Sequence, residues 1–171
     1  MRLLTDAMLG TLTTYLRFAG HDTAYALQEG VEADDAVLGL CEREGRRLVT
    51  RDRDLAARAS GSFLLTERDV EDQLAELAEQ GVDLPVPAEP TRCGACNGRL
   101  ERVPAGEPTP EYAPAASGGA AGGSDSGNPG PDSVGPGSGS DGFRIWRCPD
   151  CGQHFWKGSH WERMAATLAA L

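Results

Sequence analysis

The sequence of 171 residues has almost no lysine and no long apolar run. Lys157 is its only lysine, and Lys plus Arg number 16 against 26 Asp plus Glu, for a formal net charge of −10. That charge excludes nucleic-acid binding by overall attraction, so contact with a polyanion must be local or metal-mediated. No apolar run approaches the roughly 18 residues of a membrane span, and the N-terminal stretch is not a signal peptide. We therefore expect a cytoplasmic protein with no membrane partner.

The first 90 residues alternate between apolar runs typical of strands and amphipathic segments typical of helices. Apolar runs predict strands at residues 2–5, 23–27, 47–50 and 62–65, and helical spacing predicts helices at residues 7–19, 34–44, 54–59 and 69–80. This alternation predicts a parallel sheet with helices on its faces, which is the α/β fold class. We take residues 1–90 as the first domain.

The composition changes at residues 85–90, where the proline-rich run PVPAEP predicts a hinge. We expect residues 91–171 to form a second, small domain that ends in a helix, with Ser159 and Glu162 spaced as a capping box. Residues 104–142 consist mainly of Gly, Ser, Pro and Ala and interrupt this domain. They contain too little apolar surface to offset the entropy of ordering, so we expect a disordered insert.

Four of the five cysteines form two C-x-x-C pairs, Cys93 with Cys96 and Cys148 with Cys151. Two intervening residues let one tight turn present both sulfurs to one ion, and two such turns complete a tetrahedral thiolate shell for Zn²⁺. In a cytoplasmic chain this pattern favours a zinc ribbon, with accidental pairs or a redox dithiol as the alternatives. A shell of four thiolates has no open position, so the predicted zinc is structural. Cys41 lies on an apolar helix face and is interpreted as a core residue.

The two cysteine-bearing segments also carry more cations than acids. They contain five candidate stacking groups, namely Trp146, Phe155, Trp156, His160 and Trp161. Some of these must form the core of so small a lobe. Compared with the acidic first domain, this lobe is nevertheless the better place for contact with phosphate.

Aspartates follow two of the predicted strands. Asp6 comes directly after the first strand, and Asp52 follows the third, with Asp54 two residues later. Ligands of open parallel sheets bind beyond the carboxyl ends of the strands, so these acids should share one edge. Asp34 opens the second predicted helix, where it either faces the same edge or caps the helix. Converging carboxylates repel one another without a cation, and Mg²⁺ or Mn²⁺ would there activate water against a phosphodiester.

Four motifs occur in order along the chain: TDAMLGTLTTYLRFAGHDT, DDAVLGLCEREGRRLVTRDRDL, RCGACNGRL and RCPDCGQHFWKGSHWERM. With them the sequence, apart from residues 104–142, resembles the Mut-seven C-terminal RNase domain family. The resemblance implies a PIN-like, three-layer nuclease domain followed by a zinc ribbon, and a ribonuclease that acts on RNA with Mg²⁺ or Mn²⁺. It places the catalytic, Mg²⁺- or Mn²⁺-binding acids at Asp6, Asp34, Asp52 and Asp54, and the zinc ligands at Cys93, Cys96, Cys148 and Cys151. Counting back from Cys41 favours Asp34 over Asp35.

Three functions remain open at this point. A metal-dependent ribonuclease is the leading one. A non-catalytic RNA-binding or adaptor protein would use the same zinc ribbon without cleavage. A hydrolase of small phosphate esters would use similar carboxylates, but the D-x-D pattern of many such enzymes is missing after the first predicted strand, where the sequence reads TDAM.

Overall fold

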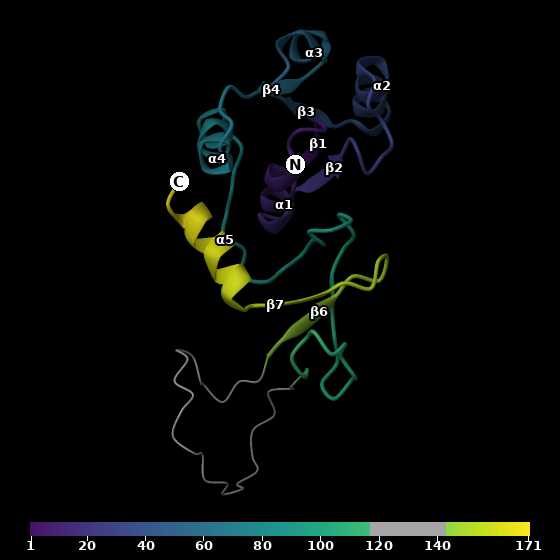
Figure 1. The fold of residues 1–171 in the computed structure, drawn as a ribbon, viewed down its shortest axis with the longest axis vertical. Coiled ribbons are helices and arrows are strands. Elements are labelled where there is room, and N and C mark those ends of the chain that lie inside the picture. The colour runs from purple at the N-terminus through teal and green to yellow at the C-terminus, as the bar shows by residue number, and fades with distance from the viewer. Residues whose placement is uncertain (117–142) are drawn as a thin grey trace, which may run out of the picture.

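The computed structural model describes residues 1–116 and 143–171, and its first part is built on a parallel sheet (Figure 1). The strands are β1 (Arg2–Thr5), β2 (Asp22–Tyr25), β3 (Arg47–Thr50) and β4 (Ser62–Leu64). They lie in the order β2-β1-β3-β4, with every neighbouring pair parallel. The helices between and after them are α1 (Gly10–Phe18), α2 (Asp34–Glu44), α3 (Arg53–Arg58) and α4 (Val70–Glu79). The predicted α/β fold class is therefore confirmed.

Both faces of the sheet are buried beneath helices. Successive residues of a strand point to opposite faces, and Leu3 and Leu4 accordingly enter two different apolar clusters. The cluster around Leu3 includes side chains of α1 and α4, and the cluster around Leu4 includes side chains of α2 and α3. Two-sided burial explains why the strands read as continuous apolar runs instead of alternating patterns.

A second, antiparallel sheet carries the cysteines. It consists of β5 (Glu101–Arg102), β6 (Ile145–Arg147) and β7 (His154–Trp156) in that order, and α5 (Ser159–Ala169) follows it. The residue before α5 is Gly158, and no side chain caps the helix. The predicted capping box of Ser159 and Glu162 is therefore wrong, because Ser159 is already the first helical residue.

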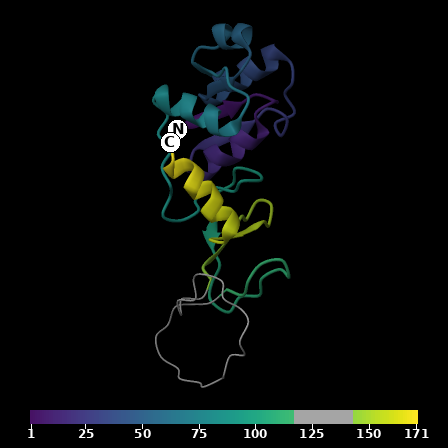
Figure 2. The same cartoon turned by 60° about the vertical axis from the view of Figure 1, so that its left-hand side comes forward.

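Helix α5 returns to the first part of the chain. Figures 1 and 2 show it beside α1 and α4. Leu168 belongs to the same buried cluster as Leu74 and Leu77 of α4, and the rings of Trp161 and Phe18 are 4.4 Å apart between centroids. The C-terminal residues thus complete the core of the parallel-sheet region. None of the helices in the described ranges is long and apolar enough to cross a membrane.

The start of the predicted disordered insert contacts the second sheet. Glu107 forms an ion pair with Arg147 of β6, and the ring of Tyr112 lies edge-on to His154 with centroids 6.3 Å apart. These contacts place residues 104–116 against the ribbon. Residues 117–142 lie outside the described residues, so the disorder expected there stays a prediction, as does a domain boundary at residue 90.

Candidate functional site

The carboxyl ends of β1 and β3 lie side by side at the centre of the parallel sheet. From β1 the chain passes to β2 on one side, and β3 then pairs with β1 on the other side. Such a reversal is a topological switch point, where open parallel sheets bind ligands. Asp6 directly follows β1, and its backbone N–H donates to Val49 of β3 over 3.0 Å. Asp52 follows the end of β3 by two residues. The expected edge therefore exists, and these two acids are the residues that follow its central strands.

Thr50 links the two acids. Its hydroxyl donates to Oδ2 of Asp6 over 2.8 Å and accepts a hydrogen bond from the backbone N–H of Asp52 over 3.0 Å. Thr50 is fully buried, so this link is held by the sheet itself. The N–H of Ala7 donates to the other Asp6 oxygen over 2.5 Å. The Asp6 carboxylate is thus oriented by two donors, and each of its oxygens has a further lone pair to offer.

Asp52 also begins α3. Its Oδ1 accepts from the N–H groups of Asp54 and Leu55 over 2.8 and 3.0 Å, which makes Asp52 the N-cap of the helix. Both bonds use the same oxygen, so within the described part of the chain Oδ2 is free for another ligand. Asp54 is exposed in the first turn of the helix.

Asp34 makes a different contact. It is the first residue of α2, with Ala33 as the N-cap and no capping bond from a side chain. Its carboxylate is 3.1 Å from the guanidinium of Arg58 on α3, which also pairs with Asp35. The structure therefore joins α2 to α3 through Arg58, and it gives Asp34 and Asp35 the same partner.

Within the described residues, the acids do not form a group that could share one metal ion. Among residues 1–116 and 143–171, only the four cysteines form a group of three or more potential ligands close enough to share an ion. Arg51 lies between Thr50 and Asp52 in sequence, and its Nε is a buried donor without a protein partner in the described ranges. This edge therefore holds two oriented carboxylates, while the positive charge of Arg51 helps to lower the pKa of Glu76 on α4, after the hydrogen bonds that Glu76 accepts from Thr66 and Glu67.

The four predicted zinc ligands converge on one point. The sulfurs of Cys93, Cys96, Cys148 and Cys151 all lie within 4.8 Å of one another, with Cys93 to Cys151 at 3.6 Å and Cys96 to Cys148 at 3.4 Å. A Zn–S length of about 2.3 Å requires S···S separations of about 3.8 Å in a tetrahedron, so the arrangement fits such an ion. A metal shell requires both cysteine pairs to converge, whereas a redox dithiol requires only one pair. The cysteine quartet, as we call these four residues, can bind a metal such as zinc.

Gly98 lets the two halves of the cysteine quartet approach. A Cβ atom at this position would lie 2.7 Å from the sulfur of Cys148 and still closer to the carboxylate of Asp150. A side chain here would therefore push the second cysteine pair away from the first. Cys41, the fifth cysteine, is buried in the core on the inner face of α2, and burial raises the pKa of its thiol to about 11, in line with a core residue.

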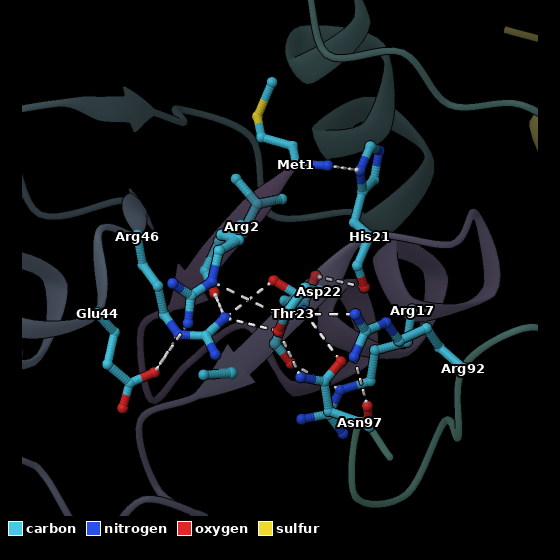
Figure 3. A network of polar contacts seen from close by, with 12 residues as sticks. Met1, Arg2, Arg17, His21, Asp22, Thr23, Glu44, Arg46, Arg92 and Asn97 are labelled. Atoms are coloured by element: carbon cyan, nitrogen blue, oxygen red, sulfur yellow. Dashed lines mark hydrogen bonds and ion pairs between the residues drawn. The ribbon is translucent and has the colours of Figure 1, made fainter. Parts of the chain in front are cut away.

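A polar network fastens the first cysteine pair to the parallel sheet (Figure 3). Asp22 of β2 accepts hydrogen bonds of 2.8 Å from Arg46 and from the side-chain amide of Asn97, the residue after Cys96. The amide oxygen of Asn97 in turn accepts from the N–H of Thr23. Partial burial alone would raise the pKa of Asp22, but the bonds from Arg46 and Asn97 hold it at about 2. Asp22 thus belongs to the connection between β2 and the first cysteine turn.

Arg17 makes a second connection. It is 2% exposed on α1, and it donates to the carbonyls of Gly94 and Ala95, between the first two cysteines, over 2.9 and 3.0 Å. Its Nε donates to the carbonyl of Thr23 over 2.8 Å. The Arg17 side chain therefore binds the first cysteine turn and not the acids of the sheet edge.

The sequence model of the Mut7-C RNAse domain family matches residues 1–118 and 132–168. No curated protein and no solved structure matches the chain. The family match contains every strand of both sheets, both cysteine pairs and nearly all of α5, and it is broken only inside the predicted insert. The resemblance drawn from the four motifs is confirmed, and the chain belongs to the Mut7-C RNAse domain family.

Proposed function

We propose that this chain is a metal-dependent ribonuclease that hydrolyses RNA phosphodiester bonds at the carboxyl ends of β1 and β3, within a PIN-like, three-layer fold. The observation that supports this most is the pair Asp6 and Asp52, joined through Thr50 at the switch point of the sheet. Membership of an RNAse family gives the reaction class. The oxygen ligands suit Mg²⁺ or Mn²⁺, which are bound by carboxylates together with substrate phosphates.

Each residue at this edge has a distinct contribution in the proposed mechanism. Asp6, oriented by Thr50 and Ala7, and Asp52, through its Oδ2, would hold the ion. When bound, Mg²⁺ or Mn²⁺ supplies a water of lowered pKa and charge stabilisation for the attacked phosphate. Asp54, in the first turn of α3, would add a third carboxylate to this edge.

Asp34 can bind the same ion only if its carboxylate leaves Arg58 for the metal. Its present ion pair with Arg58 is exposed, and exposed pairs contribute little to stability, so the exchange costs little free energy. We propose it as the outermost ligand, in preference to Asp35, whose side chain is 90% exposed against 51% for Asp34.

The cysteine quartet is proposed to hold a structural Zn²⁺. Four thiolates leave no position for water or substrate, so this ion would stabilise the fold without taking part in hydrolysis. Thiols that remain free for a metal agree with the proposed cytoplasmic location.

A test of the function uses labelled single-stranded RNA with zinc-loaded protein in Mg²⁺ or Mn²⁺. Asp6→Asn and Asp52→Asn should each lower the cleavage rate by about 100-fold or more, because a catalytic metal contributes several kcal/mol to the transition state. Asp72→Asn, an exposed carboxylate change on α4, is the matched control and should retain full activity. Full activity of both Asp6→Asn and Asp52→Asn would contradict the mechanism.

A second candidate is a non-catalytic RNA-binding or adaptor protein. It is favoured by one observation, namely that the acids of the described residues do not form a group close enough to share an ion. RNA binding without cleavage, in every metal tested, would select this function. Turnover of small phosphate esters but not of RNA would exclude both candidates.

A further inference from the structure

A cavity of about 470 Å³ opens between α1 and the ribbon. Its walls come from α1, from the first cysteine turn, from β7 and from α5, and they include Thr14, Phe18, Phe155, Trp156, Trp161 and Met164. The volume is in the range of small-molecule sites. None of the four proposed catalytic acids lines it, so it is separate from the edge described above.

The aromatic walls differ in what they already contact. One neighbour of Trp161 is the ring of Phe18, and the Lys157 ammonium lies 5.4 Å from its ring centroid. Phe155 and Trp156 are only half-buried. The Trp156 indole lies so close to the backbone of Gly158 that a Cβ atom there would be 2.8 Å from its Nε1. The indole thus packs directly against Gly158 and is still partly exposed.

The cavity lining contains no Asp or Glu, in a protein of net charge −10. Its guanidinium is that of Arg92, which also pairs with Asp22 over 3.6 Å, and the Lys157 ammonium lies beside the Trp161 ring. His154 and His160 add two imidazole rings to the lining. Gln153 and Ser159 add hydrogen-bonding groups at the rim. An anionic ligand with a flat aromatic part and a polar edge matches this set, because bases stack on aromatic side chains while cations attract the backbone phosphates.

We propose that this cavity binds a nucleobase of single-stranded RNA, stacked on Trp156, next to the segment that is cleaved. The proposal rests on the proposed function, since it places the substrate of that site. Helix α1 connects the two places: its first turn follows Asp6, and Thr14 and Phe18 on its later turns line the cavity. The helix rises roughly 12 Å from Gly10 to Phe18, a distance that a short single strand can bridge.

The test measures binding separately from cleavage. The probe is a fluorescein-labelled oligouridine of about twelve nucleotides, within the site size of common single-strand binders. It is titrated by anisotropy into zinc-loaded, full-length Asp6→Asn protein, which should leave it uncut. Adding Trp156→Ala should raise the dissociation constant by about fivefold or more, the loss expected for one stacked base. Trp156→Phe retains a stacking face and should bind within about twofold of the parent.

Two further variants keep the result interpretable. Gly158→Ala should displace the indole and weaken binding without removing any aromatic group. Phe143→Ala removes an aromatic side chain that is 51% exposed on the same lobe but outside the cavity, and it should leave binding unchanged. Zinc content and melting temperature are measured for every variant, and if Trp156→Ala loses its zinc, Gly158→Ala decides.

The outcomes separate this proposal from the proposed function. Unchanged affinity in folded Trp156→Ala or Gly158→Ala overturns the cavity assignment, even if the wild type cleaves RNA. Failure of the parent to bind the probe at low salt also overturns it and would leave the cavity to an apolar peptide. Binding that depends on Trp156, in a wild type that cuts no RNA, would support the cavity and contradict the ribonuclease.

Discussion

The cysteine quartet and the acidic edge are both candidate metal sites, but they are assembled to different degrees. The quartet draws its ligands from two pairs separated by 51 residues, from 97 to 147, and all four sulfurs already lie within 4.8 Å. At the acidic edge only Asp6 and Asp52 are linked, through Thr50, while Asp34 is held by Arg58. The ligands of the quartet thus converge although they are far apart in sequence, whereas the acids converge only in part.

The partners of the ligands explain the difference. Neutral thiols do not repel one another, and the first cysteine turn is fixed to the sheet region by Arg17 and Asn97. Carboxylates do repel one another, so without a cation each is stable where it finds its own donor. The Asp52 carboxylate accepts hydrogen bonds at the amino end of α3, and the Asp34 carboxylate pairs with Arg58. The quartet suits a permanent ion, and the acidic edge suits ions that arrive with a phosphate.

The largest expected effect comes from breaking the quartet. Cys148→Ser should abolish binding of one Zn²⁺ per chain and lower the melting temperature by more than about 10 °C, because structural zinc contributes several kcal/mol to folding. Arg17 and Asn97 join the quartet to α1 and β2, so we expect the parallel-sheet region to be destabilised as well. Elemental analysis and thermal melts measure both effects. Cys41→Ala is the matched control, and full zinc content in Cys148→Ser would contradict the assignment.

An intermediate effect is expected where the two regions meet. Asp22→Asn removes the charge that Arg46 and Arg92 face, and Arg46 is only 8% exposed. The pKa of Asp22 is about 2, below its ordinary value of 3.8, so ionised Asp22 stabilises the fold above about pH 4. The substitution should cost about 2 kcal/mol at pH 7, or roughly 4–8 °C in melting temperature.

The pH dependence of this variant has a definite sign. Because the folded-state pKa is the lower one, the advantage of the wild type over Asp22→Asn should shrink as the pH falls from 4 to 2. Melts of both proteins over this range measure it. Asp72→Asn should match the wild type throughout. A difference that grows towards pH 2 would show that the ion pairs of Asp22 do not stabilise the fold.

The smallest effect concerns Arg58. If Asp34 is a ligand, Arg58→Gln frees it and should strengthen Mn²⁺ binding by up to about fivefold, the scale of an exposed ion pair. Titration of Mn²⁺ by its paramagnetic resonance signal measures this. Arg53→Gln removes an exposed cation from the same helix and should leave the affinity nearly unchanged. Equal affinity in Arg58→Gln and the wild type would remove Asp34 from the site.

Much of the fold follows from local pattern. The strands at residues 2–5 and 47–50 and the helix at residues 34–44 have the predicted bounds, because each is an apolar run or periodic segment between polar residues or glycines. The predicted start of the first helix is three residues early, since a turn closed by the N–H of Leu9 and the carbonyl of Asp6 precedes it. The strand-end rule likewise placed Asp6 and Asp52 at one edge.

What the sequence did not reveal depends on contacts between distant segments. Arg17 is only eleven residues from Asp6 in sequence, yet its buried guanidinium donates to two carbonyls in the distant turn at Gly94 and Ala95. The pairing of Asp34 with Arg58 depends on how α2 packs on α3, which no local pattern records. The sequence gives one weak indication of the role of Thr50, because β1 and β3 both end in threonine shortly before an aspartate.

The most direct test of the central claim is the location of Mn²⁺ in crystals of the zinc-loaded protein soaked with Mn²⁺. Anomalous scattering distinguishes the two elements at their absorption edges. We predict a zinc peak inside the quartet and a manganese peak between the carboxylates of Asp6 and Asp52, and the manganese peak should disappear in Asp6→Asn crystals. Manganese elsewhere, with none beside Asp6 in the wild type, would contradict it.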